Sequence, residues 1–143
     1  ELEPHEVLIE AALEAIARKR TQDALAATQQ LCGAHGAIAL AAGLRRTTPL
    51  AGLIALSTYL PAPDKAAGAL RPGAERQPLF MAHGMGDPVV PYAAGEQSAT
   101  MLRRMGFAVD WHRYPMAHQV CVEELRDLGD WLEARFAGFP AAG

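Results

Sequence analysis

Three short segments with the residue patterns of β-strands determine which fold this chain can adopt. They are Leu53–Leu56, Leu79–Ala82 and Phe107–Tyr114. The first two are uninterrupted apolar runs, which is typical of strands buried on both faces. In the third, Val109 and Trp111 point to one face while Asp110 and His112 point to the other. Strands that alternate with helices at this spacing form parallel sheets with right-handed crossovers, so we expect an α/β fold of about three parallel strands.

Helical patterns occupy much of the remaining sequence. The expected helices are Glu3–Arg20, Thr21–Gln30, Ala37–Leu44, Tyr92–Met105 and Val122–Phe136. In the last helix an apolar stripe faces the core, formed by Leu125, Leu128, Trp131, Leu132 and Phe136. The stretch Pro61–Pro78 contains four prolines and is predicted to be a loop with at most one helical turn. Pro115–Val120 is predicted to be a second loop.

Composition restricts the classes of partner. The chain has 143 residues, half of them hydrophobic, which fits one globular domain over residues 1–143. Its net charge is −3 and no run of Lys and Arg exceeds three residues, so neither a nucleic acid nor a membrane is expected as a partner. The two cysteines, Cys32 and Cys121, have no metal-binding spacing and suggest free thiols in the cytoplasm. We expect no metal and no cofactor.

Parallel sheets place their ligand sites just beyond the carboxyl ends of the strands. Three segments of this chain follow strands in that way: Ser57–Tyr59, Gly84–Pro91 and Pro115–Gln119. We therefore expect all three to meet at one edge of the sheet.

Asp87 and His118 are the residues at this edge that suggest catalysis. A carboxylate that accepts from one imidazole nitrogen fixes the tautomer and leaves the other nitrogen as a general base. In α/β-hydrolases the acid precedes the histidine in chain order, and each lies in a loop after a strand. Taken singly, Asp87 is better explained as a turn residue and His118 as an exposed loop histidine. Their order and placement together favour a catalytic pair.

Three motifs resemble those of the bacterial phospholipase/carboxylesterase family, whose relatives include the acyl-protein thioesterases. They are Leu50–Pro61, Met81–Pro91 and Trp111–His118. The similarity extends from Gly36 to Phe136 and implies the C-terminal half of an α/β-hydrolase. In this interpretation residues 1–35 form a divergent helical segment and residues 36–137 the hydrolase-like part. The resemblance implies that Asp87 is the catalytic acid and His118 the base.

The chain departs from this family at the nucleophile. The family's serine elbow reads Gly-Phe-Ser-Gln-Gly-Gly, whereas this chain has Leu-Cys-Gly-Ala-His-Gly at positions 31–36, with Gly33 where the serine would stand. Ser57, at the end of the first strand, is the candidate nucleophile, although a residue there can also cap the strand. Cys32 is a weaker candidate and is also explained as a small buried residue. The backbone N–H groups of Gly33 and Gly36 are candidates for an oxyanion site.

Only two serines are present, and Ser98 is discounted as a nucleophile because it is expected to face solvent on a helix. The first hypothesis is a carboxylic-ester hydrolase that acts on short acyl esters. The alternatives are an inactive domain that binds a ligand and a fragment that a partner chain completes. The uncharged strand Leu53–Leu56 favours a homodimer, unless the segment Glu3–Gln30 folds back and seals a monomer.

Overall fold

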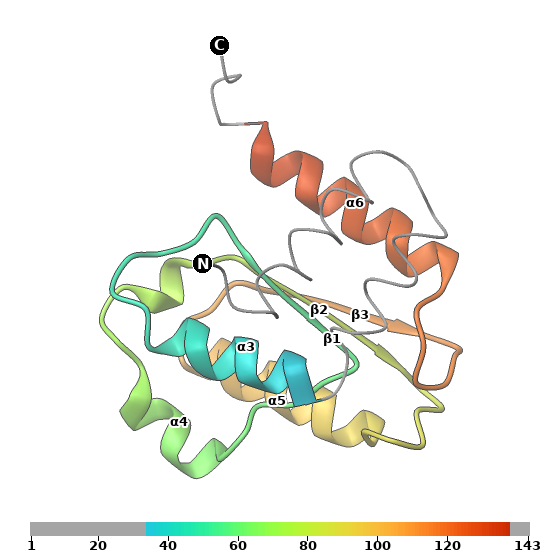
Figure 1. Ribbon diagram of the computed structural model, residues 1–143, viewed down its shortest axis with the longest axis horizontal. Helices are drawn as coiled ribbons and strands as arrows, with labels where there is room; N and C mark the ends of the chain where they lie inside the picture. The colour runs from blue at the N-terminus through green and yellow to red at the C-terminus, as the bar shows by residue number, and fades with distance from the viewer. Residues whose placement is uncertain (1–33, 138–143) are drawn as a thin grey trace.

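The computed structural model of the protein describes residues 34–137, and within them three parallel strands form one sheet (Figure 1). The strands are β1 (Leu53–Leu56), β2 (Leu79–Gly84) and β3 (Val109–Tyr114), in the order β1-β2-β3. Leu53 of β1 lies opposite Leu79 of β2, and Leu79 lies opposite Val109 of β3. The expected three-stranded parallel sheet is confirmed.

The strand boundaries differ from expectation at two places. β2 runs two residues beyond Ala82, because its ladder with β3 continues until Gly84 lies opposite Tyr114. β3 begins at Val109 and not at Phe107, because the Phe107 N–H donates to the carbonyl of Leu102 and so belongs to the turn that ends the preceding helix. The first difference brings His83 and Gly84 into the central strand, where all six residues are buried.

Helices cover both faces of the sheet. On one face lie α3 (Ala34–Leu44), α4 (Pro63–Ala69) and α5 (Tyr92–Arg104), and on the other lies α6 (Val122–Phe136) (Figure 1). The first face packs around Leu40, Leu44, Ala55, Leu60, Ala66, Leu79, Met81, Ala99, Leu102 and Phe107. The second packs around Leu56, Phe80, Ala82, Tyr114, Met116, Val120, Leu125, Leu128 and Leu132. Val109 and Trp111 of β3 pack against the first cluster, and His112 stacks on Phe80 of the second, which confirms the predicted alternation.

The stretch Pro61–Pro78 is more helical than predicted. It holds the seven-residue helix α4 and the 3₁₀ helix η1 (Ala74–Arg76), so the expectation of at most one turn is wrong. Pro63 stands in the first turn of α4, where a missing N–H costs nothing, and Ala66 is buried in the core. Three of the four prolines of this stretch lie at or just before the starts of these helices and do not prevent them from forming.

Helix α3 begins at Ala34, three residues before the predicted start. Gly36 in its first turn lies against Thr58, since a Cβ on Gly36 would lie 2.8 Å from the Thr58 Cβ. The start of α3 is thereby packed against the loop that follows β1. The helices expected at Glu3–Arg20 and Thr21–Gln30 lie outside the described residues.

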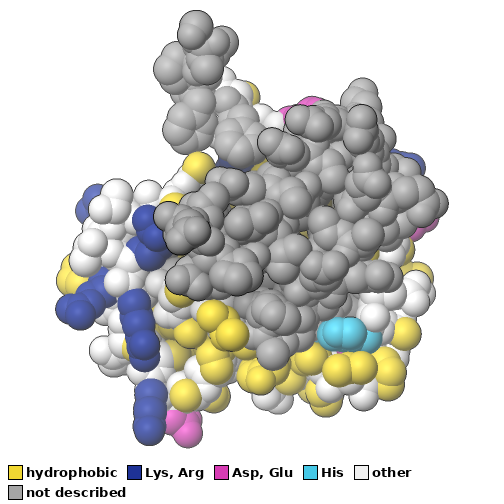
Figure 2. Space-filling model, in the orientation of Figure 1, with side chains coloured by type: hydrophobic (Ala, Val, Ile, Leu, Met, Phe, Trp, Pro, Cys, Tyr) yellow, Lys and Arg dark blue, Asp and Glu magenta, His cyan; other side chains and the backbone are white. Residues whose placement is uncertain are grey.

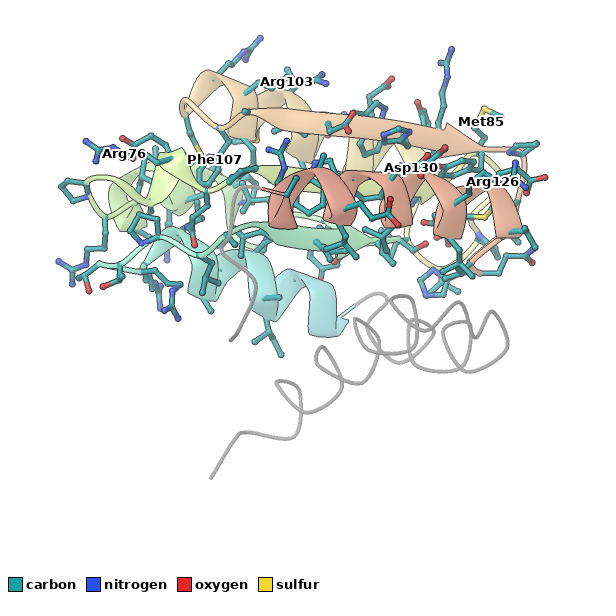
Figure 3. The ribbon with its side chains drawn as sticks, turned by 90° about the horizontal axis from the view of Figure 1, so that it is seen from above. Arg76, Met85, Arg103, Phe107, Arg126 and Asp130 are labelled. Atoms are coloured by element: carbon teal, nitrogen blue, oxygen red, sulfur yellow. The ribbon has the colours of Figure 1, made fainter. Side chains whose placement is uncertain are left out.

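The amino end of the sheet carries structural hydrogen bonds and positive charge. The buried Gln77 amide donates to the carbonyls of Gly43 and Ala74 and accepts from Leu50 N–H. Exposed arginines also gather at this end: Arg45, Arg46, Arg71 and Arg76. Figure 2 shows a group of Lys and Arg side chains on the left of the molecule. In Figure 3, Arg76 and Phe107 lie at this end and Met85 and Arg126 at the opposite one. Within residues 34–137 no helix has the length and apolarity needed to cross a membrane.

Candidate active site

The loops that follow β2 and β3 both lie at the carboxyl end of the sheet (Figure 1), where backbone hydrogen bonds connect them. Met85 N–H donates to the Tyr114 carbonyl at 2.9 Å, and Gly86 N–H donates to the Met116 carbonyl at 3.0 Å. Beside them, Ser57 N–H donates to the carbonyl of Ala82 on β2 at 2.8 Å. The predicted meeting of the three segments at one edge is therefore confirmed.

Gly84 is where these loops come closest. A Cβ on this residue would lie 2.3 Å from the carbonyl oxygen of Ala117 and 2.4 Å from that of Met116. Both obstructing atoms belong to the backbone and cannot rotate away. Glycine is therefore required here for a steric reason, and its absent side chain lets the loop that carries His118 lie against the loop that carries Asp87.

The Asp87 carboxylate accepts three short hydrogen bonds. Oδ1 accepts from the N–H groups of Val89 at 2.8 Å and Val90 at 2.9 Å. Oδ2 accepts from Nδ1 of His118 at 2.7 Å. The Asp87 side chain is fully buried, whereas the His118 side chain is 22% exposed. The expected contact between Asp87 and His118 is thus present, with the acid inside and the imidazole at the surface.

The environment of Asp87 keeps it ionised. Burial alone raises the pKa of this carboxyl, but the hydrogen bonds from His118, Val90 and Val89 outweigh burial and lower the pKa below its usual value. Since Oδ2 accepts from Nδ1, the tautomer assigned to His118 carries its hydrogen there and leaves a lone pair on Nε2. Within the described residues that nitrogen makes no hydrogen bond, so it is available as a proton acceptor.

His83 lies buried beneath the acid turn, and sequence reasoning missed it as a part of the site. Its Nε2 is 2.8 Å from the Val90 carbonyl oxygen and 3.4 Å from Oδ2 of Asp87. The prediction that β2 ends at Ala82 placed His83 in the turn itself. An imidazole four residues before the acid was the available signal, because a turn brings residues at that spacing together.

Ser57 occupies an unusual position at the end of β1. Its backbone has a φ of 50°, in the left-handed region that non-glycine residues adopt at a cost of roughly 1–2 kcal/mol. The residue is fully buried, and its Oγ has no hydrogen-bond partner. Among residues 34–137 this hydroxyl therefore does not contact His118. The next residue, Thr58, is the one that packs against Gly36 of α3.

Ser98 is not solvent-facing, as the sequence suggested, but 5% exposed. Its hydroxyl donates to the Ala94 carbonyl at 2.6 Å and accepts from Leu60 N–H at 2.8 Å, which ties α5 to the loop after β1. Both functions of the hydroxyl are thus used structurally. Cys32 and Gly33 lie outside the described residues, and no group of three His, Cys, Asp or Glu side chains suited to a metal occurs within them.

A second buried carboxyl, Glu124, lies near the start of α6. Neither of its oxygens has a hydrogen-bond partner. Burial raises the pKa of Glu124 to about 8; the backbone N–H of Cys121 opposes this rise, and the charge of Asp127 adds to it. Burial, assisted by a hydrogen bond to Asp127, also raises the pKa of Tyr114, whose hydroxyl donates to Asp127 at 2.6 Å.

Cys121, at the N-cap of α6, is a poor nucleophile. Burial raises the pKa of its thiol; the backbone N–H of Glu124 opposes the rise, and the carboxyl groups of Glu124 and Glu123 add to it. Because the thiolate is the reactive form, this environment suppresses attack by Cys121 although it lies three residues after His118.

A parallel sheet between two layers of helices, with a carboxylate–imidazole pair at its carboxyl end, defines an α/β-hydrolase. Residues 33–135 match the phospholipase/carboxylesterase family, and the chain belongs to that family. The chain is 43% identical over 103 residues to acyl-protein thioesterase 1 of Mycosarcoma maydis, covering 68% of this chain and 43% of that protein. The match to acyl-protein thioesterase 1 of Neurospora crassa is 43% identical over 103 residues, covering 70% and 42%. The chain thus spans less than half the length of these relatives.

Solved structures agree on the fold. The crystal structure of Arabidopsis thaliana SOBER1 superposes with a TM-score of 0.69 at 21% identity, covering 95% of this chain and 68% of that one. Zea mays acyl-protein thioesterase 2 superposes with a TM-score of 0.61 at 25% identity, covering 71% and 50%. These similarities extend the α/β-hydrolase assignment to the spatial arrangement of the elements.

The close contact at Gly84 predicts that Gly84→Ala separates the two site loops. The new methyl group would meet two backbone oxygens, so we expect a loss of roughly 3 kcal/mol in the free energy of unfolding, measured by urea titration. Gly86→Ala is the matched control, since its Cβ would lie at an ordinary 3.5 Å from the Met116 oxygen. Equal stability of the two variants would contradict the proposed close contact.

Glu124 predicts a pH dependence of stability. With a pKa of about 8 in the folded protein against an ordinary pKa of 4.5, Glu124 holds a proton in the native state that the unfolded chain releases, so stability falls as pH rises from about 4.5 to 8. Glu124→Gln removes this proton uptake and should flatten the decline by roughly 1–3 kcal/mol over that window. Urea titrations at pH 5 and pH 8 measure this fall in the free energy of unfolding, with exposed Glu123→Gln as the control. An equal fall in wild type and Glu124→Gln would refute the prediction.

Proposed function

We propose that this protein is a carboxylic-ester hydrolase that acts on short acyl esters, with His118 as general base and Asp87 as the acid that orients it. The 2.7 Å contact between Asp87 Oδ2 and His118 Nδ1 carries the proposal. It leaves Nε2 basic and partly exposed at the carboxyl end of the sheet, where hydrolases of this fold act. Family membership supports the same reaction class.

The reaction we propose follows from these positions. Nε2 of His118 takes the proton of the attacking hydroxyl as its oxygen bonds to the acyl carbon, and the ionised Asp87 stabilises the resulting imidazolium. The imidazolium then returns the proton to the alkoxide that leaves. A water molecule then attacks the acyl carbon while Nε2 takes its proton. The imidazolium returns this proton to the departing oxygen of the nucleophile, which releases the acid and restores the hydroxyl.

Ser57 is the nucleophile we propose among the described residues. Strained backbone at a strand end and a buried hydroxyl without a partner are features that gather at functional sites. Since Ser57 is fully buried, attack requires the loop after β1 to move and expose Oγ. Cys32 remains the weaker candidate, and the N–H groups of Gly33 and Gly36 remain the proposed oxyanion donors; Gly36 lies in the first turn of α3.

The names of the relatives suggest a second substrate to test. Both fungal relatives are acyl-protein thioesterases, so a short acyl thioester belongs beside an oxygen ester in the assay. Faster turnover of the thioester would identify the sulfur leaving group as the preferred one without altering the roles proposed for the residues.

For the proposed hydrolase, we expect His118→Ala to lower kcat/KM for a p-nitrophenyl short-chain ester about 1,000-fold or more. Ser57→Ala should cause a loss of the same size, and the double variant no further loss, because members of a catalytic unit act together. Ser98→Ala is the matched control for loss of a buried serine hydroxyl. A native rate in Ser57→Ala would move the proposal to Cys32, which Cys32→Ala then tests; a native rate in His118→Ala ends it.

One observation favours an inactive domain that binds a ligand as the second candidate. Within residues 34–137 no hydroxyl or thiol contacts Nε2 of His118. A serine-directed fluorophosphonate probe separates the two functions: labelling that depends on His118 supports the hydrolase, and the absence of labelling supports the binding domain.

We further propose that the protein forms a cytoplasmic homodimer. Among the described residues β1 has a neighbouring strand on one side alone, and Ile38 and Leu50 beside it are 55% and 41% exposed. Apolar surface next to an unpaired strand edge favours association. The free thiol of Cys121 supports a reducing compartment.

A dimer of this kind predicts a light-scattering mass of two chains at micromolar concentration. Ile38→Lys should shift the mass to one chain, because a charge on this surface must lose its hydration in the interface. Val122→Lys, at an equally exposed apolar position on α6, is the control that should remain dimeric. A one-chain mass for the unmodified protein would disprove the dimer.

A further inference from the structure

His83 has one nitrogen that must donate a hydrogen bond. Its ring is 1% exposed, and Nε2 lies 2.8 Å from the Val90 carbonyl oxygen, which can only accept. Nε2 therefore carries the hydrogen. Oδ2 of Asp87 lies 3.4 Å from the same nitrogen.

The other nitrogen of His83 is packed against helix α5. Nδ1 is buried without a hydrogen-bond partner, and it faces α5 at Gly95, where a Cβ would lie 2.5 Å from it. Around the ring stand Tyr92 of α5, with its ring centroid at 6.2 Å, and Trp111 of β3, at 6.4 Å. Among residues 34–137, Asp87 and Tyr92 are the titratable groups that these contacts place around His83. A second hydrogen, on Nδ1, would be buried without an acceptor, so the geometry favours the Nε2–H tautomer.

Val90 transmits the effect of this hydrogen bond to the acid. Its N–H donates to Oδ1 of Asp87, and its carbonyl oxygen accepts from His83. The turn is therefore fixed to β2 by a side chain of that strand. Without the donor, the Val90 carbonyl would be left buried and unpaired, and the turn would be free to rotate Oδ2 away from His118.

We propose that His83 is a positioning residue, which as a neutral imidazole holds the Asp87 turn through its hydrogen bond to Val90 so that Oδ2 stays directed at His118. The catalytic meaning of this role rests on the proposed function. The positioning itself does not, because it concerns the contact between Asp87 and His118.

Two substitutions of similar shape separate the donor from the volume it fills. His83→Gln keeps an N–H donor on an unbranched side chain, and His83→Met keeps the unbranched shape without a donor. The readout is the NMR signal of the His118 Nδ1–H hydrogen, which a short bond to a carboxylate protects from exchange with water. We expect His83→Met to speed this exchange at least tenfold, and His83→Gln to keep it within about threefold of wild type.

General loosening of the fold is controlled at the other end of the sheet. Gln77→Met removes a buried amide that makes three hydrogen bonds around the amino end. It should lower stability and leave the exchange of the His118 hydrogen unchanged. If Gln77→Met accelerates this exchange as much as His83→Met, the effect comes from lost stability and the proposal fails.

Two further measurements keep the proposal testable if His83→Met does not fold. In the unmodified protein, long-range ¹H–¹⁵N spectra of the imidazoles should show His83 as the Nε2–H tautomer; an Nδ1–H or doubly protonated ring overturns the proposal. Gly95→Ala, whose methyl group must displace the ring, should also speed exchange of the His118 hydrogen. Native exchange in both His83→Met and Gly95→Ala, or equal acceleration in His83→Gln and His83→Met, would likewise overturn it.

Activity gives a separate reading. If the protein hydrolyses esters, His83→Met should lower kcat at least tenfold with KM nearly unchanged, and His83→Gln should restore most of the rate. Absence of turnover in the unmodified protein would count against the proposed function alone, because the exchange of the His118 hydrogen still reports on positioning.

Discussion

The contact of Gly84 with the carbonyls of Met116 and Ala117 is the constraint on which the whole carboxyl end depends. The parallel register carries β2 two residues past the point where apolar character ends and sets Gly84 opposite Tyr114. With no side chain at this position, the N–H groups of the loop after β2 can donate to carbonyls at the end of β3 and in the loop after it. The imidazole of His118 thereby comes within reach of the acid. The geometry of the pair is thus set by backbone packing before either functional side chain contributes.

Two buried carboxyls in this protein show how surroundings decide charge. Asp87 is buried but accepts three hydrogen bonds, and the pKa of its carboxyl is lowered. Glu124 is buried more completely and its oxygens have no hydrogen-bond partner, and burial raises its pKa to about 8. At neutral pH the first is therefore a stable anion beside an imidazole, while the second largely keeps its proton. An acid that orients a base must be of the first kind, because only an ionised carboxylate stabilises an imidazolium.

Chain order and strand ends were sufficient to predict the contact between Asp87 and His118, because parallel strands bring the loops after them to one edge. Two apolar segments and one alternating segment likewise predicted the three strands, and the helical spacing of apolar residues predicted the bounds of α6. The features that the local sequence pattern did not predict depend on residues far away in the chain or across a turn. Ser98 is buried because the N–H of Leu60 needs an acceptor, and His83 matters because the Val90 carbonyl lies within reach of its ring. Neither relation has a signature in the residues next to the one concerned.

The same reasoning explains why the acid–base part of the site is recognisable and the attacking group is not. A carboxylate and an imidazole need fixed mutual geometry, so they depend on strand register, turn chemistry and a glycine contact that leave traces in sequence. A nucleophile needs one accessible oxygen or sulfur, and the described residues offer Ser57 in a strained and buried position. The strain costs free energy that no contact of Ser57 Oγ returns, since this hydroxyl has no partner. A strained conformation persists in a packed interior where the surrounding structure or the chemistry of the site requires it. Here the surrounding structure gives a reason for the backbone of Ser57, because its N–H donates to the Ala82 carbonyl and completes the ladder between β1 and β2. The hydroxyl itself has no such structural reason, and this is why we propose a chemical role for it.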